Sequence, residues 1–394
     1  MAKNGRPDRR PIGRGLAAGV VLAGLAAIAI IVGTVKFAPV AATPSSSAIP
    51  TEVALASASP SPSLTPAPTP QPTPAPTSVL VPAPLTGLLV SPEAALRHPI
   101  AVMIDDHDAA RPQSGFNAAS IVFQAPAEGG IPRYMLVFQD KLPTALGPIR
   151  SSREYYIDWA AEWRPMYVHF GGSSQALDTL RVHGSGGYVW NADGLRWAQD
   201  GFMWRIHTRL APHNVYTDAV HLEALARRIG VPDGPLPPAW SFVADDNVAV
   251  RPTGNAITVN YPYETITARY DPTRNAYLRY INGSKKPQVD AADSQVVAPT
   301  NIVVLRMHFG PLTQNDPHHR LEASDIGHGD AWISTGGMTI HGSWKKSSVT
   351  GQLQLFDASG NPAVLQPGQT FVEVITLDYG YKIVQGKLPT PTAS

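Results

Sequence analysis

The hydrophobic positions of the chain form one long apolar run near the N-terminus and, much later, a series of short runs. Residues 15–35 contain no charged residue, and a run of this length can cross a bilayer as a helix. Only one acid, Asp8, precedes the run, against five basic residues: Lys3, Arg6, Arg9, Arg10 and Arg14. The excess of positive charge predicts that residues 1–14 are a cytoplasmic tail, that residues 15–35 form a single transmembrane anchor, and that the remainder is extracytoplasmic.

A cleavable signal peptide is the alternative for this run, with Val40-Ala41-Ala42 as its cleavage site. The run is longer than the usual core of a signal peptide, and Lys36 separates it from that site. An uncleaved signal anchor is therefore the favoured interpretation.

Residues 36–84 have no hydrophobic periodicity and consist largely of Pro, Ser, Thr and Ala. Such a composition cannot bury a core, which predicts a disordered, proline-rich linker. An extended chain of this kind covers roughly 3 Å per residue, so the linker could hold a folded domain on the order of 100 Å from the membrane.

From residue 85 to residue 238, apolar runs typical of strands alternate with patterns typical of helices. Strands are predicted at 99–104, 120–124, 134–138 and 166–170. Ser151 or Ser152 is predicted to cap a first helix, Ser173 a second, and a third helix is expected at 218–229. This alternation predicts an α/β N-terminal domain at 85–238.

The pattern changes after the proline-rich segment 232–238, because strand patterns continue and no helix pattern follows. Good hairpin turns lie at 271–275 and 357–361. Strands are predicted at 256–261, 276–282, 301–309, 338–344, 352–356 and 371–376. We therefore expect a mostly-β C-terminal domain at 245–378, followed by a tail at 379–394.

Composition restricts the chemistry of the protein. Lys and Arg number 31 against 30 Asp and Glu, so no basic face typical of nucleic-acid binding is expected. The sequence contains no cysteine, which excludes disulfides, thiol catalysis, cysteine-bound zinc and a cysteine-linked lipid anchor. No motif predicts a cofactor: the turn after residue 170 lacks both the Walker signature and the dinucleotide-binding fingerprint.

Seven sequence motifs follow one another along residues 84–375: IAVMIDDHDAARPQSGFNAASIVFQAPAEGGIPRYMLVFQ, GPIRSSREYYIDWAAEW, YVHFGGSSQAL, APHNVY, YDPTRNAYLRYINGS, HGSWKK and LQPGQTFVEVI. In these motifs the chain resembles a family of bacterial cell-envelope proteins, the DUF3048 (YerB-like) family. The resemblance implies an α/β domain and a β-rich domain on the outer face of the membrane, and it implies no defined chemistry. Many members carry a lipid-bearing cysteine, which the transmembrane helix replaces here. Asp106 stands where the family has Asn, and Gln124 stands where it has Glu.

Two arginines in the segment GPIRSSREYY form the first candidate site. Arg150 and Arg153 at a helix start would lie on one side of the helix, beside free backbone N–H groups and the positive end of the dipole. Guanidinium groups suit carboxylate or phosphate, so these residues, with Ser151 and nearby Arg133, predict an anion-binding cradle. The alternative is that the arginines pair with Glu128 or Asp105 and brace the fold.

Two further turns could contribute to the same ligand site. His169 ends a predicted strand, and Gly171, Gly172 and Ser173 lead into a helix N-terminus that could receive an anion. The alternative is a tight turn in which Ser173 only caps the helix. His213 and Asn214 present an imidazole and an amide just before another helix; a structural hydrogen-bonded histidine is the favoured interpretation there.

Catalytic and metal-binding interpretations have weaker support. Asp105, Glu128 and His169 are the acid–base candidates. A serine nucleophile would need Ser151 or Ser173 beside His169 or His213, and neither a GxSxG nor an SxxK motif accompanies them.

No metal site is expected. Consecutive side chains of Asp105-Asp106-His107-Asp108 point to opposite sides of an extended segment. The pair His318-His319 lies in a polar loop and is expected to be solvated.

The sequence thus favours a non-enzymatic envelope protein that binds a cell-wall component or a wall-synthesis protein through an arginine-lined polar groove. The alternative is an extracytoplasmic hydrolase or transferase acting on cell-wall glycan or peptide. Geometry distinguishes the two, because an enzyme requires Asp105, Glu128 and His169 to converge around an open cleft.

Overall fold

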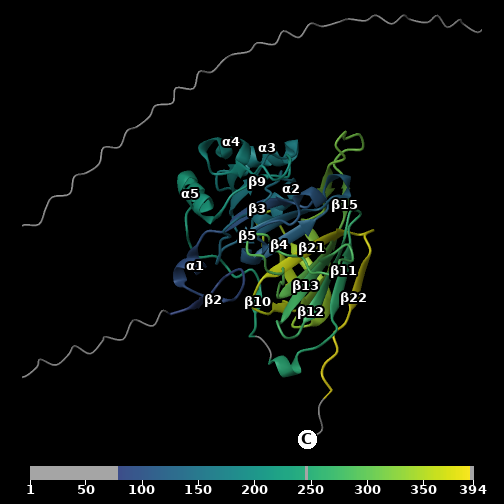
Figure 1. The fold of residues 1–394 in the computed structure, drawn as a ribbon. Coiled ribbons are helices and arrows are strands. Elements are labelled where there is room, and N and C mark those ends of the chain that lie inside the picture. Colours follow the sequence, from purple (N-terminus) through teal and green to yellow (C-terminus); the bar gives the residue numbers. More distant parts are fainter. Residues whose placement is uncertain (1–78, 245–246, 391–394) are drawn as a thin grey trace, which may run out of the picture. The chain divides into compact units, whose positions relative to one another are not determined.

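The computed structural model describes residues 79–244 and 247–390, which belong to one compact unit (Figure 1). The predicted cytoplasmic tail, the predicted membrane helix at 15–35 and most of the predicted linker lie outside these described residues. Within the described ranges, no helix is long and apolar enough to span a membrane.

A ten-stranded mixed sheet dominates the described part of the chain, and it takes strands from both predicted domains. Strand β21 lies between β14 and β4 and is parallel to both. The order across the sheet is β19 (Gln354–Phe356), β18 (Met338–Lys346), β17 (Gly327–Thr335), β14 (Asn301–Met307), β21 (Thr370–Thr376), β4 (Ile121–Ala125), β5 (Arg133–Phe138), β3 (Ile100–Asp105), β6 (Met166–His169) and β7 (Trp190–Asp193). The two sequence regions therefore share one sheet.

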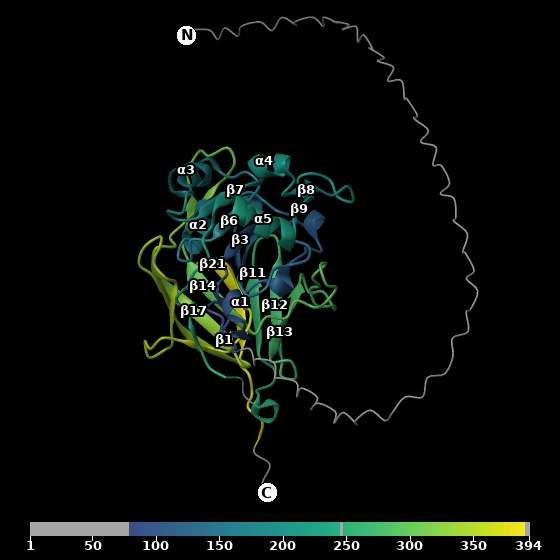
Figure 2. The same cartoon turned by 90° about the vertical axis from the view of Figure 1, so that its left-hand side faces the viewer.

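The α-helices of the described chain all precede residue 230, and α3, α4 and α5 gather at one end of the molecule in both views (Figures 1 and 2). They are α1 (Pro92–Leu96), α2 (Glu154–Ala160), α3 (Ser174–His183), α4 (Gly194–Trp197) and α5 (Ala219–Ile229). Strands dominate the rest, which confirms the β-rich C-terminal region predicted from the sequence.

A second, four-stranded antiparallel sheet is built from the C-terminal region, in the order β13 (Ala276–Ile281), β12 (Thr265–Asp271), β11 (Ala256–Asn260) and β22 (Tyr381–Val384). Strand β22 falls within the segment predicted as a tail, and β1 falls within the predicted linker. The remaining strands form four short pairs: β1 (Val81–Pro82) with β2 (Leu89–Val90), β8 (Trp204–Arg205) with β9 (Val215–Tyr216), β10 (Ser241–Phe242) with β20 (Val364–Leu365), and β15 (Phe309–Pro311) with β16 (Leu321–Ala323).

Two hydrophobic cores cover the two faces of the ten-stranded sheet. Alternate residues of a strand face opposite sides, so Met103 of β3 joins one core and Val102 the other. Helix α2 fills the first core with Trp159, which stacks on Phe123 at 5.5 Å between ring centroids. The four-stranded sheet and α5, through Leu222 among others, fill the second core.

The predicted helix start at Ser151 or Ser152 is wrong: residues 150–153 are extended, and α2 begins at Glu154 after Arg153. The cause is tertiary hydrogen bonding. The Arg150 N–H donates to the Met103 carbonyl at 2.8 Å, and the Ser152 N–H donates to the Gly171 carbonyl at 2.9 Å. These strand-like bonds hold the segment beside the ends of β3 and β6, so the two arginines are not neighbours on a helical turn.

Candidate functional site

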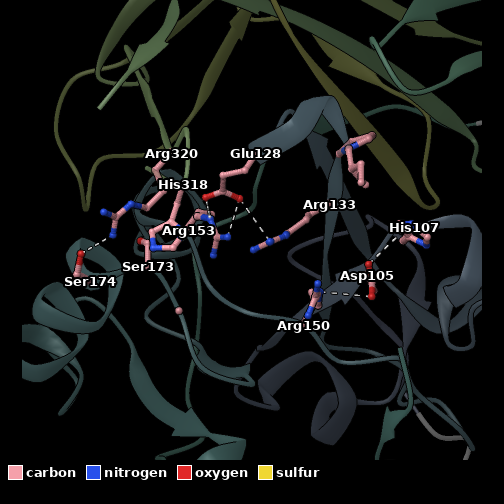
Figure 3. A pocket seen from close by; sticks show the side chains of 13 residues that line it. Asp105, His107, Glu128, Arg133, Arg150, Arg153, Ser173, Ser174, His318 and Arg320 are labelled. Atoms are coloured by element: carbon pink, nitrogen blue, oxygen red, sulfur yellow. Dashed lines mark hydrogen bonds and ion pairs between the residues drawn. The ribbon is translucent and has the colours of Figure 1, made fainter. Parts of the chain in front are cut away.

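A polar pocket of about 500 Å³ opens where the extended segment 150–153 meets the ends of several strands and the start of α3 (Figure 3). Four arginines and two carboxylates line it, so cationic groups outnumber anionic ones in its wall. The lining residues are Asp105, His107, Glu128, Ile131, Pro132, Arg133, Arg150, Arg153, Gly172, Ser173, Ser174, His318 and Arg320.

The register of strands β3 and β5 places Asp105 beside Arg133 in the wall of the pocket. Asp105 ends β3 and is the direct antiparallel partner of Arg133, which begins β5. Glu128 lies in the connection between β4 and β5. The charged residues of this wall thus come from strand ends and connections, where side chains can leave the sheet without burying polar groups in the core.

Glu128, Arg153 and Arg133 form a compact ion cluster. Arg153 contacts both carboxylate oxygens of Glu128, with Nε on Oε1 and a terminal nitrogen 2.6 Å from Oε2. Arg133 lies 3.4 Å from the same Oε2 and also donates to the carbonyl and hydroxyl oxygens of Ser151, at 2.8 and 3.0 Å. A bidentate guanidinium–carboxylate pair is geometrically specific, so Arg153 is held by the fold.

The pKa shifts of this cluster follow from burial and from the neighbouring charges. Burial alone would raise the pKa of Glu128, but the hydrogen bonds and charges of Arg153 and Arg133 outweigh it and lower that pKa. Burial, together with repulsion from Arg153, lowers the pKa of Arg133 to about 10, against the attraction of Glu128. Two arginines on one carboxylate leave the cluster with a formal net positive charge, so a further anion would be stabilised beside them.

Arg150 is held differently from Arg153. Its Nε lies 3.4 Å from Asp105 Oδ2, and its side chain is 29% exposed. Among the described residues, its two terminal nitrogens form no hydrogen bond. The same Oδ2 of Asp105 lies 2.6 Å from Nδ1 of His213. The His213 ring stacks on the His107 ring, with 4.6 Å between the ring centroids. Arg150 thus differs from Arg133, Arg153 and Arg320, whose terminal nitrogens form hydrogen bonds.

Both ion pairs of the alternative interpretation are formed, Arg153 with Glu128 and Arg150 with Asp105. The same arginines line the pocket, so bracing the fold and facing the pocket occur together. Arg153 gives most of its donors to the fold, whereas Arg150 keeps its terminal nitrogens for the cavity.

The turn at residues 171–173 forms the opposite wall. Gly171 has a φ of +68°, a conformation that favours glycine. Ser173 caps α3 by accepting the Ala176 N–H at 3.2 Å, as predicted from the sequence. Arg320, from the loop between β15 and β16, donates to the Ser174 hydroxyl at 2.6 Å and pairs with Asp316.

Five predicted ligand residues do not line the pocket, namely Ser151, Gly171, His213, His169 and Asn214. The last two are the most fully engaged elsewhere. His169 is fully buried, and its ring nitrogens lie 2.8 Å from the Gly171 carbonyl and from Oδ1 of Asn191. Asn214 accepts from Arg205 and donates to two backbone carbonyls. Both side chains use their hydrogen-bonding groups within the fold.

The acid–base candidates do not converge. Asp105 and Glu128 are each held by cationic partners, and buried His169 contacts neither of them. Ser151 accepts hydrogen bonds from Arg133 and Arg153 and contacts no histidine. Among residues 79–244 and 247–390, no three His, Asp or Glu side chains gather in a way that could hold a metal ion.

Sequence reasoning missed several lining residues, namely His107, Ile131, Pro132, Ser174, His318 and Arg320. His318 is exposed, as expected, yet it lines the pocket. Arg320 reaches Ser174 across 146 positions of sequence, and no local pattern reveals such a contact.

The fold and pocket define a two-part, sheet-rich protein with an arginine-lined polar pocket at the ends of its strands. Comparison with known proteins agrees with the resemblance. Residues 85–231 match "Protein of unknown function (DUF3048) N-terminal domain", and residues 257–372 match the C-terminal domain of the same name. The chain belongs to the DUF3048 family.

Two comparisons identify relatives of known sequence or structure. The chain is 30% identical over 301 residues to "Putative lipoprotein YerB" of Bacillus subtilis (strain 168), a match covering 74% of this chain and 86% of that protein. It is also similar to the crystal structure of the YerB protein from Bacillus subtilis, with a TM-score of 0.67 and 27% identity, covering 77% of this chain and 99% of that one.

Proposed function

We propose that this protein is a membrane-anchored extracytoplasmic protein that binds an anionic cell-wall component through its arginine-lined pocket. The name of the Bacillus subtilis relative describes a lipoprotein. Because the present sequence has no cysteine to carry a lipid, we assign the attachment to the apolar run at residues 15–35. The proline-rich linker would then carry the folded part away from the membrane.

The observation that carries this proposal is the state of Arg150. Among the described residues, its guanidinium lines the pocket with both terminal nitrogens free of hydrogen bonds, beside a cluster of two arginines and one carboxylate. A planar guanidinium with free donors binds phosphate or carboxylate well. The rival hypothesis, a hydrolase or transferase, lacks the convergence of Asp105, Glu128 and His169 that it requires.

Co-sedimentation with purified cell-wall sacculi tests the proposal, using a soluble chain of residues 74–394. These residues form one compact unit with its own cores, and a crystallised relative has a similar extent. We expect the wild-type chain to co-sediment and Arg150→Ala to lower the bound fraction several-fold. Arg181→Ala is the matched control, since it removes an exposed arginine on α3 that pairs with exposed Asp178 and lies outside the pocket lining.

Arg150 is preferable to Arg153 as the target. Removing Arg153 would leave Glu128 buried without its main partner, and loss of a buried partner costs stability. Equal co-sedimentation of Arg150→Ala and the wild-type chain would show that the pocket is not the wall-binding site.

A further inference from the structure

A second pocket of about 220 Å³ adjoins the arginine-lined one, because the two share Arg153, Ser173 and Arg320 in their walls. Helix α2 and strand β16 contribute half of its lining residues. Its lining is Arg153, Glu154, Tyr155, Asp158, Ser173, Gln175, Leu312, Arg320, Leu321, Glu322, Ala323 and Asp325. A ligand that fills the first pocket can therefore extend into the second.

The charge of the second pocket is opposite to that of the first. The two shared arginines are already paired outside the second pocket's lining, Arg153 with Glu128 and Arg320 with Asp316. The other charged residues of its lining are all acids, namely Glu154, Asp158, Glu322 and Asp325. Within the described part of the chain, none of these four forms an ion pair. The second pocket thus offers uncompensated carboxylates.

Asp325 provides an independent sign that a partner is missing. The residue is only 5% exposed, and its Oδ2 has no hydrogen-bond partner among the described residues. A buried polar atom without a partner is costly, and each such atom in a native structure needs an explanation. A donor group of a ligand in the second pocket would satisfy this oxygen.

Lys346 of β18 is the buried cation of this region, and it does not supply that donor. Its ammonium donates to the Gly351 carbonyl at 2.5 Å and forms no ion pair with Asp158, Glu162 or Asp325 within the described residues. Burial lowers the pKa of Lys346, against the attraction of these three acids.

We propose that the two pockets form one bipolar site, in which the arginine-lined pocket holds an anionic group and the acidic pocket holds a primary ammonium group of the same ligand. The ligand class is a zwitterion that carries an amine together with a phosphate or carboxylate. An ammonium group, with its three donors, suits the acidic pocket. This inference rests on the proposed function and specifies its ligand.

Proton release accompanies this binding. Burial, followed by the charge of Asp158, raises the pKa of Asp325 to about 8, and burial with the charge of Glu154 raises that of Asp158 to about 7. The groups facing Asp325 are Asp158, Glu154 and Lys346. Since an ammonium group favours the ionised carboxylates, binding at pH 7 releases on the order of one proton. Affinity for the amine therefore rises from pH 6 to pH 8.

The test compares binding of two preparations of wall fragments solubilised with a muramidase. In the first preparation the amines are left free. The second is N-acetylated, which removes the ammonium charge and keeps the anionic groups. Calorimetry with residues 74–394 in two buffers of different ionisation enthalpy measures both affinity and proton release. We expect acetylation to weaken binding on the order of tenfold. A further arm uses fragments stripped of phosphodiester polymers with hydrofluoric acid, and it distinguishes phosphate from carboxylate as the anion.

Asp325→Asn should bind both fragment preparations equally weakly, with the proton release lost. The substitution keeps the shape of a side chain whose Oδ2 has no hydrogen-bond partner among the described residues, so the fold should persist. Glu223→Gln on α5 is the matched control for charge, because it lies outside both pockets. If acetylation leaves wild-type affinity unchanged while Arg150→Ala weakens it, the bipolar site is overturned and the proposed function stands. If wild-type protein binds neither preparation, both fail.

Discussion

At the scale of single residues, the buried charges of this protein work in groups rather than in isolated pairs. Asp106 is fully buried; its Oδ2 accepts from the Gln124 amide at 2.7 Å and its Oδ1 from Arg111 at 2.8 Å. The resemblance implies Asn and Glu at positions 106 and 124. Because the two side chains touch, the acid and the amide have exchanged places, and the pair keeps one of each.

We therefore predict strong coupling between these two positions. Gln124→Glu alone would place a third carboxylate beside Asp106 and Glu264, and we expect it to cost about 3 kcal/mol of unfolding free energy. Adding Asp106→Asn should recover most of that loss, because one acid and one amide are restored. Urea unfolding of the four variants at pH 7 measures the coupling, and strictly additive effects would contradict it.

The pH dependence provides a control for that prediction. Burial and the charge of Glu264 raise the pKa of Asp106 well above its usual value, in spite of Arg111. A raised pKa contributes stability that is fully present below the unfolded value of about 4 and is lost as pH rises. Asp106→Asn should therefore gain stability relative to wild-type protein between pH 4 and pH 7, and an opposite trend would exclude this account.

Residue identity alone did not reveal which arginine keeps free donors. Arg150 and Arg153 lie in the same short segment, and both lie near a carboxylate. The difference arises from tertiary placement. Both carboxylate oxygens of Glu128 contact Arg153, whereas Oδ2 of Asp105 contacts His213 as well as Arg150. The sequence could therefore predict an anion site and its alternative, but not how the two arginines divide these roles.

At the scale of elements, the sequence predicted the strands and the helix cap that depend on neighbouring residues alone. Apolar runs located β3, β4 and β5 to within a residue or two, and Ser173, predicted to cap a helix, is the N-cap of α3. The start of α2 was missed because backbone bonds to distant strands override the local capping signal. Strand β17 was missed because its first half, GHGD, is polar and lies outside the core.

The cap of α3 gives a prediction at this scale. Ser173→Ala removes the acceptor of the Ala176 N–H, and we expect a loss of about 1 kcal/mol in unfolding free energy. Because the first turn of α3 lines both pockets, binding to sacculi should weaken as well. Ser359→Ala, at an exposed serine in the turn after β19, should change neither quantity. Urea unfolding and co-sedimentation measure the two effects, and an unchanged stability would show that the cap contributes little.

At the scale of the whole molecule, one strand decides how the two family regions are joined. Strand β21 comes from the C-terminal region and pairs with β4 of the N-terminal region and with β14. Buried Arg279 crosses the same boundary, because it donates to Gln124 at 2.6 Å and to Glu373 at 2.7 Å. Pairing between strands so far apart in sequence leaves no local pattern, so the sequence predicted two regions and not their shared sheet.

The shared sheet predicts that residues 74–394 unfold in one cooperative transition. Separating the regions would expose the pairing edge of β4 and divide both hydrophobic cores, which contain residues from either side. A chain ending at residue 240 should therefore not fold by itself. Both regions contain tryptophan, for example Trp159 and Trp344, so urea unfolding followed by fluorescence and by far-UV circular dichroism reports on each. Coincident curves are expected; two separate transitions, or a folded N-terminal fragment, would show that β21 adds to a sheet that is already stable.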